Sequence, residues 1–206
     1  TAKLLSKKLN FVHLNSGLLY RAVTYIFIKN NFINQKSISI KQFFKNNNIT
    51  LEGQNLDKVI WNGINITEHL SSELINKNIN IISCNSLIRE YLVDKQRSLS
   101  LDKNIVCEGR DIGTIVFPNA EYKFYLNASL QSRINRRYDE FKESNNIITK
   151  KEIKYNLIQR DANDINRKIS PLLKAKDAIE IDTTNISIKN QVLIIYNNIK
   201  QGKMND

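Results

Sequence analysis

The sequence is poor in the residues that break, bend or cross-link a chain. Its 206 residues include two prolines, two cysteines, six glycines and one tryptophan. Cys84 and Cys107 are far apart and lie outside any Cys/His spacing typical of a metal site, so neither a disulfide framework nor a zinc site is expected. No Pro- or Gly-rich linker and no internal repeat divides the chain. These scarcities favour one domain in a reducing, cytoplasmic compartment.

Long hydrophobic runs are also missing. No apolar stretch approaches the ~18 residues of a membrane-spanning helix, and no signal-peptide h-region is visible near Thr1. We therefore expect no membrane partner. The hydrophobic content of 41% is nevertheless sufficient for the core of one sizeable α/β domain.

Acidic residues are outnumbered, with 20 Asp and Glu against 31 Lys and Arg, a net charge of +11. Such a balance indicates a polyanionic partner: nucleic acid, a membrane surface or phosphorylated small molecules. Much of the excess is lysine spread through all segments, which is typical of a solvated surface. An RNA-binding protein would interleave aromatic residues with a basic face, whereas Phe43, Phe44, Phe124 and Tyr125 fit a core. We expect no nucleic-acid partner.

Strands alternate with helices along most of the chain, which predicts a mostly parallel sheet covered on both faces. The predicted strands are residues 11–14, 104–107, 122–126 and 179–182, and the predicted helices are 1–9, 18–28, 38–47, 85–99, 130–141, 150–162 and 187–199. Residues 48–66 differ, because β-rich segments flank an Asn-Gly pair, a strong hairpin signal. They predict a small antiparallel sheet inserted into the α/β chain, and residues 67–83 predict one or two short helices.

A motif with two glycines and adjacent opposite charges follows the predicted strand 104–107. Residues 108–114 read Glu-Gly-Arg-Asp-Ile-Gly-Thr. Glycine tolerates positive φ and permits close approach of other groups to the backbone. The carboxyl end of a parallel strand is where open α/β sheets bind ligands. The alternative is a surface turn with a solvated ion pair.

Arginines gather at the ends of the predicted elements, together with a few polar residues. The set is Ser16, Arg21, Arg89, Arg110, Asp111, Arg133, Arg136, Arg137, Arg160, Asp164 and Arg167. Arginine is the better bidentate phosphate ligand, and phosphoryl transfer depends mainly on positioning and charge neutralisation. Taken singly, each arginine could equally be an exposed helix residue. Together they indicate a site for a small phosphorylated molecule.

Segments spread over nearly the whole chain resemble the bacterial type of cytidylate (CMP/dCMP) kinase. They are residues 15–21, 106–118, 133–137, 160–167 and 181–184. Each is weak alone, but their order and spacing are specific, and the run Gly-Arg-Asp-x-Gly-Thr-x-Val-Phe-Pro is close to diagnostic. The resemblance implies transfer of the ATP γ-phosphoryl group to CMP or dCMP, with Mg²⁺.

The same resemblance implies a P-loop NTPase fold of the nucleoside monophosphate kinase type. This fold is a three-layer α/β/α arrangement with a parallel sheet. Within one domain over residues 1–206, it implies a CMP-binding insert of antiparallel strands and helix at 35–88 and a helical lid at 138–165. We expect the protein to be a monomer.

Roles follow from the resemblance residue by residue. CMP or dCMP binding falls to Ser16, Tyr20, Arg21, Asn80, Arg89, Arg110, Asp111, Arg160 and Asp164. Catalytic roles fall to Asn15, Arg110, Arg133, Arg137 and Arg167, and of these Arg133, Arg137 and Arg167 also contact ATP. Asp111 and Arg89 resemble the cytosine readers, since an Asp can accept from the 4-amino group that uracil lacks. No residue is assigned as a metal ligand.

The sequence departs from the family pattern at several places. Asn15 stands where the family usually has Asp, Asn80 where it has Ser, and residues 70–72 read Leu-Ser-Ser instead of Ile-Arg-Thr. Thr1 aligns just after the Gly-rich Walker A loop, whose Lys holds the β/γ-phosphates. We therefore expect this sequence to lack the family's N-terminal strand and P-loop and to have little kinase activity alone. A non-catalytic nucleotide-binding protein and a kinase with another base preference remain as alternatives.

Overall fold

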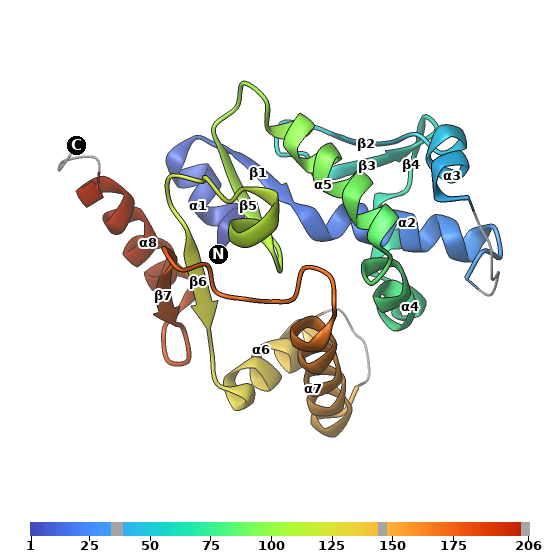
Figure 1. Cartoon of the computed structure of the whole chain (residues 1–206). Coiled ribbons are helices and arrows are strands. Elements are labelled where there is room, and N and C mark those ends of the chain that lie inside the picture. Colours follow the sequence, from blue (N-terminus) through green and yellow to red (C-terminus); the bar gives the residue numbers. More distant parts are fainter. Residues whose placement is uncertain (34–38, 144–147, 203–206) are drawn as a thin grey trace.

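The computed structural model describes residues 1–33, 39–143 and 148–202 of the chain. Helices surround two short parallel sheets and one antiparallel sheet (Figure 1). The predicted α/β class is confirmed. None of the described helices is long and apolar enough to cross a membrane.

The first parallel sheet joins the start of the chain to the glycine-rich motif. Strand β1 (Val12–Asn15) pairs with β5 (Ile105–Glu108), and the register places Asn15 beside Glu108. Helix α1 (Ala2–Leu9) precedes β1, and α2 (Ser16–Lys29) follows it without a loop. The side chain of Asn15 accepts a hydrogen bond from Gly17 N at 3.0 Å and so caps α2. The start of α2 therefore lies next to the carboxyl end of β5.

The second parallel sheet consists of β6 (Phe124–Asn127) and β7 (Ile179–Asp182). Helix α8 (Ile188–Gly202) packs on it through Val192, Ile195 and Ile199, with Ile181 and Leu5 in the same cluster. Among the described strands, β5 bonds only to β1 and β6 only to β7, so the predicted parallel strands form two separate sheets. The two sheets meet instead through side chains of the cluster around Ile181.

The predicted small antiparallel sheet within residues 48–66 is confirmed, with the three strands β2 (Ile49–Glu52), β3 (Lys58–Trp61) and β4 (Ile64–Asn65). Its hairpin turns at Asn62 and Gly63, with φ of 48° and 84°, the conformation that the Asn-Gly pair predicts. Around it lie α3 (Ile40–Asn46), the 3₁₀ turn η1 (Thr67–Ser71), α4 (Glu73–Ser83) and α5 (Ser86–Ser100). Residues 35–38 of the predicted insert lie outside the described residues.

Two helices form a separate projection below the sheets (Figure 1). They are α6 (Leu130–Glu143) and α7 (Lys150–Asn166), and residues 144–147 of the predicted lid lie outside the described part. A capping box of Thr149 and Glu152 starts α7. The helix continues past the predicted end at residue 162, so Asp161 and Asp164 project from regular helix.

Candidate active site

Gly109 allows the start of α2 to touch the end of β5. Ser16 Oγ donates to Glu108 O at 2.8 Å, and a Cβ added at position 109 would overlap Ser16 Oγ and lie 2.8 Å from Ile112 Cδ1. Neither Gly109 nor Gly113 has positive φ; among the described glycines only Gly53 and Gly63 do. Of the two reasons for glycine that the motif offers, close approach is therefore the one that applies.

Arg89 and Asp111 form a buried ion pair at the centre of the predicted site. Their side chains are only 4% and 7% exposed, and Arg89 Nη2 donates to Asp111 Oδ2. Arg89 Nη1 also donates to Ser83 O at 3.1 Å, at the end of α4. Because a buried charge is costly without a partner, each residue fixes the other. Three separate segments, α4, α5 and the loop after β5, meet here.

Three polar atoms around this pair are buried without a hydrogen-bond partner in the described part of the chain: Tyr20 Oη, Arg89 Nε and Arg167 Nη2. The Arg89 guanidinium lies 5.4 Å from the centre of the Tyr20 ring. Burial raises the pKa of Tyr20 to about 12, with Arg89 and Arg167 opposing and Asp111 adding to the rise. Unsatisfied buried donors are uncommon in folded proteins, so their gathering here is consistent with a polar ligand site.

Asp164 on α7 faces three arginines. Its carboxylate lies 2.8 Å from Arg110 Nε, 3.6 Å from Arg167 Nη1 and 3.9 Å from Arg160 Nε. Burial and the charge of Arg110 lower the pKa of Arg160 to about 10, although Asp164 counteracts them. One carboxylate does not neutralise three guanidinium groups, so this corner attracts an additional anion.

Arg21 extends the cluster from α2. It donates to Leu70 O at 2.8 Å and to Asn76 Oδ1 at 2.9 Å. Burial and the charge of Arg137 lower its pKa. Asn80 lies half-buried on α4, one turn before the Ser83 carbonyl that holds Arg89. The residues predicted to bind the acceptor nucleotide thus converge from α2, α4, α5, α7 and the loop after β5.

The three arginines predicted to contact ATP lie in different surroundings. Arg133 makes a bidentate pair with Asp161 of α7 at 2.7 and 2.9 Å. Arg137 pairs with Glu140 at 2.6 Å and lies over the Phe141 ring. The pKa of Arg167 is lowered first by burial and then by Arg89. Arg167 is thus influenced by the charges of the Arg89–Asp111 pair, and its Nη1 lies 3.6 Å from Asp164 Oδ1.

The family model for cytidylate kinase matches residues 1–201 of this chain. The chain belongs to the cytidylate kinase family. It is 39% identical over 202 residues to a cytidylate kinase of Fusobacterium nucleatum subsp. nucleatum, covering 98% of this chain and 91% of that protein. A cytidylate kinase of Clostridium botulinum (strain Okra / Type B1) is 39% identical over 97% of this chain and 91% of its own. A cytidylate kinase of Listeria innocua serovar 6a is 40% identical over 91% of this chain and 84% of its own length.

Family membership agrees with the α/β architecture, which is consistent with a P-loop fold of the nucleoside monophosphate kinase type. A metal site made by protein side chains is not present in the described residues, where no three His, Cys, Asp or Glu side chains cluster. The carboxylates nearest the arginines, Asp111, Asp164 and Glu108, all have basic partners. These carboxylates therefore do not form a set of ligands that fits a resident metal ion.

The sequence analysis did not identify two contacts near the predicted site. His13 is buried and its Nε2 lies 2.9 Å from Glu108 Oε1. This hydrogen bond, aided by the charges of His13, the chain's amino terminus and Arg110, lowers the pKa of Glu108 against the effect of burial. Arg97 binds the backbone of the turn that follows Asp111. Both contacts join residues far apart in sequence, so no local pattern signals them.

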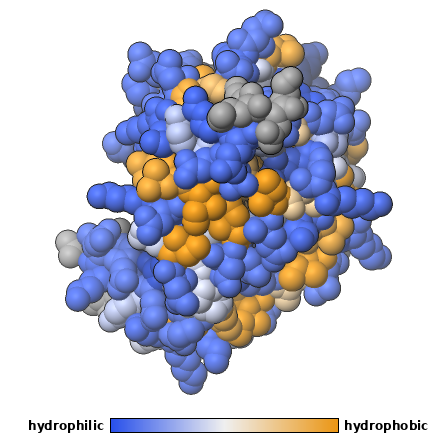
Figure 2. Space-filling view, turned by 90° about the vertical axis from the view of Figure 1, so that its left-hand side faces the viewer, coloured by the Kyte–Doolittle hydropathy of each residue, from blue (hydrophilic) through white to orange (hydrophobic). Residues whose placement is uncertain are grey.

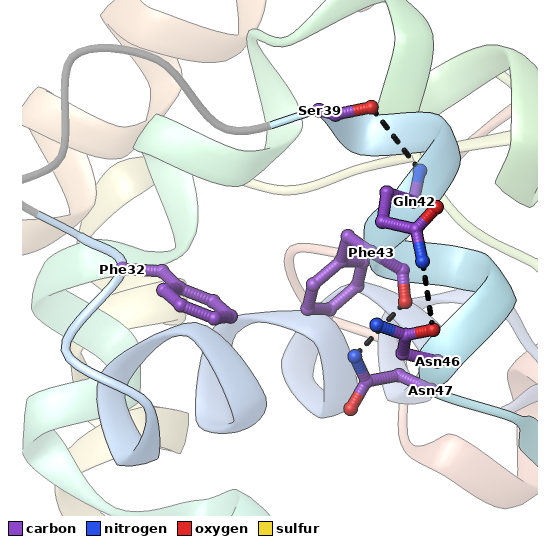
Figure 3. Close-up of a pocket in the computed structure, with 6 residues that line it drawn as sticks. All are labelled: Phe32, Ser39, Gln42, Phe43, Asn46 and Asn47. Carbon is purple, nitrogen blue, oxygen red and sulfur yellow. Dashed lines mark hydrogen bonds between the residues drawn. The ribbon is translucent and has the colours of Figure 1, made fainter.

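Two hollows lie elsewhere, beside α3. One of about 170 Å³ is lined by Phe32, Ser39, Gln42, Phe43, Asn46 and Asn47. Its two aromatic rings point toward one another, and the hydrogen bonds drawn join its polar residues to each other or to the α3 backbone (Figure 3). A wider groove of about 710 Å³ runs between α3 and α5. Neither includes a residue of the arginine cluster, so neither supports the predicted chemistry.

Proposed function

We propose that this chain provides the acceptor site of an enzyme that transfers the ATP γ-phosphoryl group to CMP or dCMP, giving CDP or dCDP. The observation that carries the proposal is the buried Arg89–Asp111 pair beside the arginines around Asp164. A carboxylate can accept from the cytosine 4-amino group, whereas uracil presents a carbonyl there. The pair thus accounts for base choice, and the arginines account for phosphate binding.

In the proposed complex, Arg110 and Arg21 hold the acceptor phosphate, with Ser16 and Tyr20 at the same turn. Arg160 and Asp164 contact the ribose and phosphate, and Asn80 contacts the base. Arg110 now donates to Asp164 at 2.8 Å, so phosphate binding exchanges one anion for another at the same guanidinium. Holding the acceptor oxygen in line and neutralising charge is most of what phosphoryl-transfer catalysis requires.

Residues 138–165 act in this proposal as a lid, with Arg133 and Arg137 closing over the transferring phosphates. Each is engaged with a carboxylate here, Asp161 or Glu140. Closure would exchange these partners for phosphate oxygens and exclude water, which suppresses ATP hydrolysis. Arg167, beside Arg89, would connect lid closure to the base site.

The described strands leave open edges near the proposed site. Strands β5 and β6 each bond to one neighbour among the described strands, so each leaves an edge for a further strand. The amino terminus is close enough to Glu108 to lower its pKa. Apolar surface gathers on the side of the molecule that faces left in Figure 1 (Figure 2). Leu126 of β6 and Ile179 of β7 are each 43% exposed.

Mg²⁺ would enter this reaction with the ATP phosphates, and no step is derived through it from the residues of this chain. Monomeric state and cytoplasmic location, both inferred from the sequence, stay predictions.

A non-catalytic nucleotide-binding protein is the second candidate. It is favoured by Asn15, which is neutral where the family usually has Asp and whose Oδ1 is engaged with Gly17 N. In this case the acceptor site would bind CMP, but turnover would not appear. A third possibility, another base preference, would leave the arginines in place and change only the ranking of the bases.

Two measurements separate these functions. Calorimetry of this chain with CMP, dCMP, UMP and AMP should give at least tenfold tighter binding for the cytosine nucleotides, and equal affinity for CMP and UMP would exclude Asp111 as the reader. In a coupled assay, turnover of CMP with ATP would support the transferase. Intact CMP binding without turnover would favour the non-catalytic protein.

A further inference from the structure

The turn that begins at Asp111 is held at both ends by one helix. Residues Ile112–Val116 form a single turn of π-helix, a rare geometry that is frequent at functional sites. At its start, Arg89 of α5 binds the Asp111 carboxylate. At its end, Arg97 of the same helix donates from Nη2 to Ile115 O at 2.9 Å and from Nε to Val116 O at 3.0 Å.

The backbone of the turn links these two ends directly. The Asp111 carbonyl accepts from Ile115 N at 2.9 Å and from Val116 N at 3.2 Å. The residues whose N–H groups hold Asp111 are therefore the ones whose C=O groups are held by Arg97. Carbonyls at the end of a helical turn have no partner within it, and a guanidinium presents donors in a rigid fork that can satisfy two of them.

We propose that Arg97 is a positioning residue for base selection, acting through the π-turn on Asp111. The inference rests on the proposed function, because Asp111 must be the cytosine reader for it to matter. Arg89 and Arg97 are eight residues apart, about 12 Å along a helix, so α5 clamps the turn at two points. This fixes both the carboxylate and the carbonyl of Asp111 before substrate arrives.

The proposed role predicts that loss of Arg97 changes CMP binding without changing the stability of the fold. The Arg97 side chain is 49% exposed, so water can replace it at the two carbonyls at little cost in stability. Loss of Arg97 should therefore leave the fold intact and release the turn. A loosened Asp111 loses the geometry that cytosine needs, whereas UMP, which does not use the carboxylate as an acceptor, is little affected.

The experiment is calorimetric binding of CMP and UMP to the chain and to Arg97→Ala, Arg97→Lys and Lys95→Ala, with a melting temperature for each. Lys95 is a matched control, a cation on the same helix that contacts neither carbonyl. We expect Arg97→Ala to weaken CMP binding about tenfold with UMP binding nearly unchanged. Arg97→Lys should recover part of the loss, and Lys95→Ala should match the parent chain.

Two results would overturn the inference: unchanged CMP binding in Arg97→Ala, or equal weakening of CMP and UMP binding with a lowered melting temperature. If the parent chain binds CMP and UMP with equal affinity, this result alone contradicts the proposed function, whatever the Arg97 variants do. If Arg97→Ala does not fold, Arg97→Gln, which keeps one donor group, gives the same comparison.

Discussion

Arg110 Nε lies 2.8 Å from Asp164 Oδ2 and so ties the loop after β5 to helix α7 of the lid. The carboxylate is only 10% exposed and also faces Arg160 and Arg167. The helix expected to move is thus attached to an arginine expected to bind phosphate. A phosphate that takes Arg110 would change the charge balance on which the position of α7 depends.

Replacement of Asp164 by Asn should therefore lower the stability of the protein, and added anions should restore part of that stability. Three guanidinium groups would lose their common partner, at a cost of up to about 3 kcal/mol in the free energy of unfolding. Urea unfolding should show the loss at low ionic strength, and added inorganic phosphate should recover part of it. Glu180→Gln removes an exposed carboxylate whose partner, Lys174, is also exposed, and it should show neither effect. A loss that phosphate does not reduce would contradict this account.

Replacement of Asp111 by Ala should remove both cytosine preference and stability. It leaves the Arg89 guanidinium buried without its partner, which typically costs about 3–5 kcal/mol. Asp111→Asn keeps an acceptor oxygen and the volume, so it should fold better and still bind CMP more weakly than the parent chain. Calorimetry with CMP and UMP after a check of folding by circular dichroism tests this. Undiminished CMP affinity in a folded Asp111→Asn protein would refute the reader role.

Gly109→Ala should separate the start of α2 from the end of β5. The new methyl group would overlap Ser16 Oγ and the Ile112 side chain, and overpacking of this kind costs about 1–3 kcal/mol. Gly113→Ala is the matched control, because its nearest neighbour is Lys123 Cδ at 3.2 Å, part of a flexible side chain. Chemical denaturation of both variants should show a clear loss only at position 109. Equal losses would mean that the motif's glycines serve a common backbone requirement instead.

Glu108 should stabilise the protein at neutral pH and lose this effect in acid. Its pKa is lowered in the folded protein, first by the hydrogen bond with His13. A carboxylate with a lowered pKa stabilises the fold above its ordinary pKa, and the contribution disappears as pH falls through the lowered value. The stability difference between the parent chain and Glu108→Gln should therefore be retained from neutral pH to about pH 5 and should shrink as the pH falls from there toward about 3. A difference that is constant over this range would show that the charge of Glu108 is irrelevant.

Tyr20→Phe should leave stability unchanged or raise it, because the hydroxyl is buried without a partner. In the parent chain, the pKa of about 12 means that stability falls as pH rises from about 10 toward 12, since only the unfolded chain ionises there. The Phe variant should lack this alkaline loss. Ultraviolet titration of phenolate, together with unfolding curves above pH 9, measures both effects. Marked destabilisation of Tyr20→Phe at neutral pH would indicate a hydrogen bond not seen in this structure.

Local chemistry in the sequence determined most of the elements. The Asn62–Gly63 pair specified a hairpin, and periodic apolar residues specified α2, α5 and α8. Helix α7 continues past its predicted end, where Asp164 has a tertiary partner, Arg110, that compensates for its unfavourable helix propensity. The order of the charged motifs also identified the family, since motif spacing is a property of the chain itself.

Only the tertiary structure decided which charges are paired and which are buried. Arg89 and Asp111 are far apart in sequence, and nothing local distinguishes Arg89 from an exposed helix residue such as Arg97, which proved to hold the π-turn. The His13–Glu108 bond, the separation of the sheets and the influence of the Arg89–Asp111 pair on Arg167 were likewise beyond sequence pattern. The physical reason is that burial, and with it the strength of an ion pair, is set by packing between distant segments.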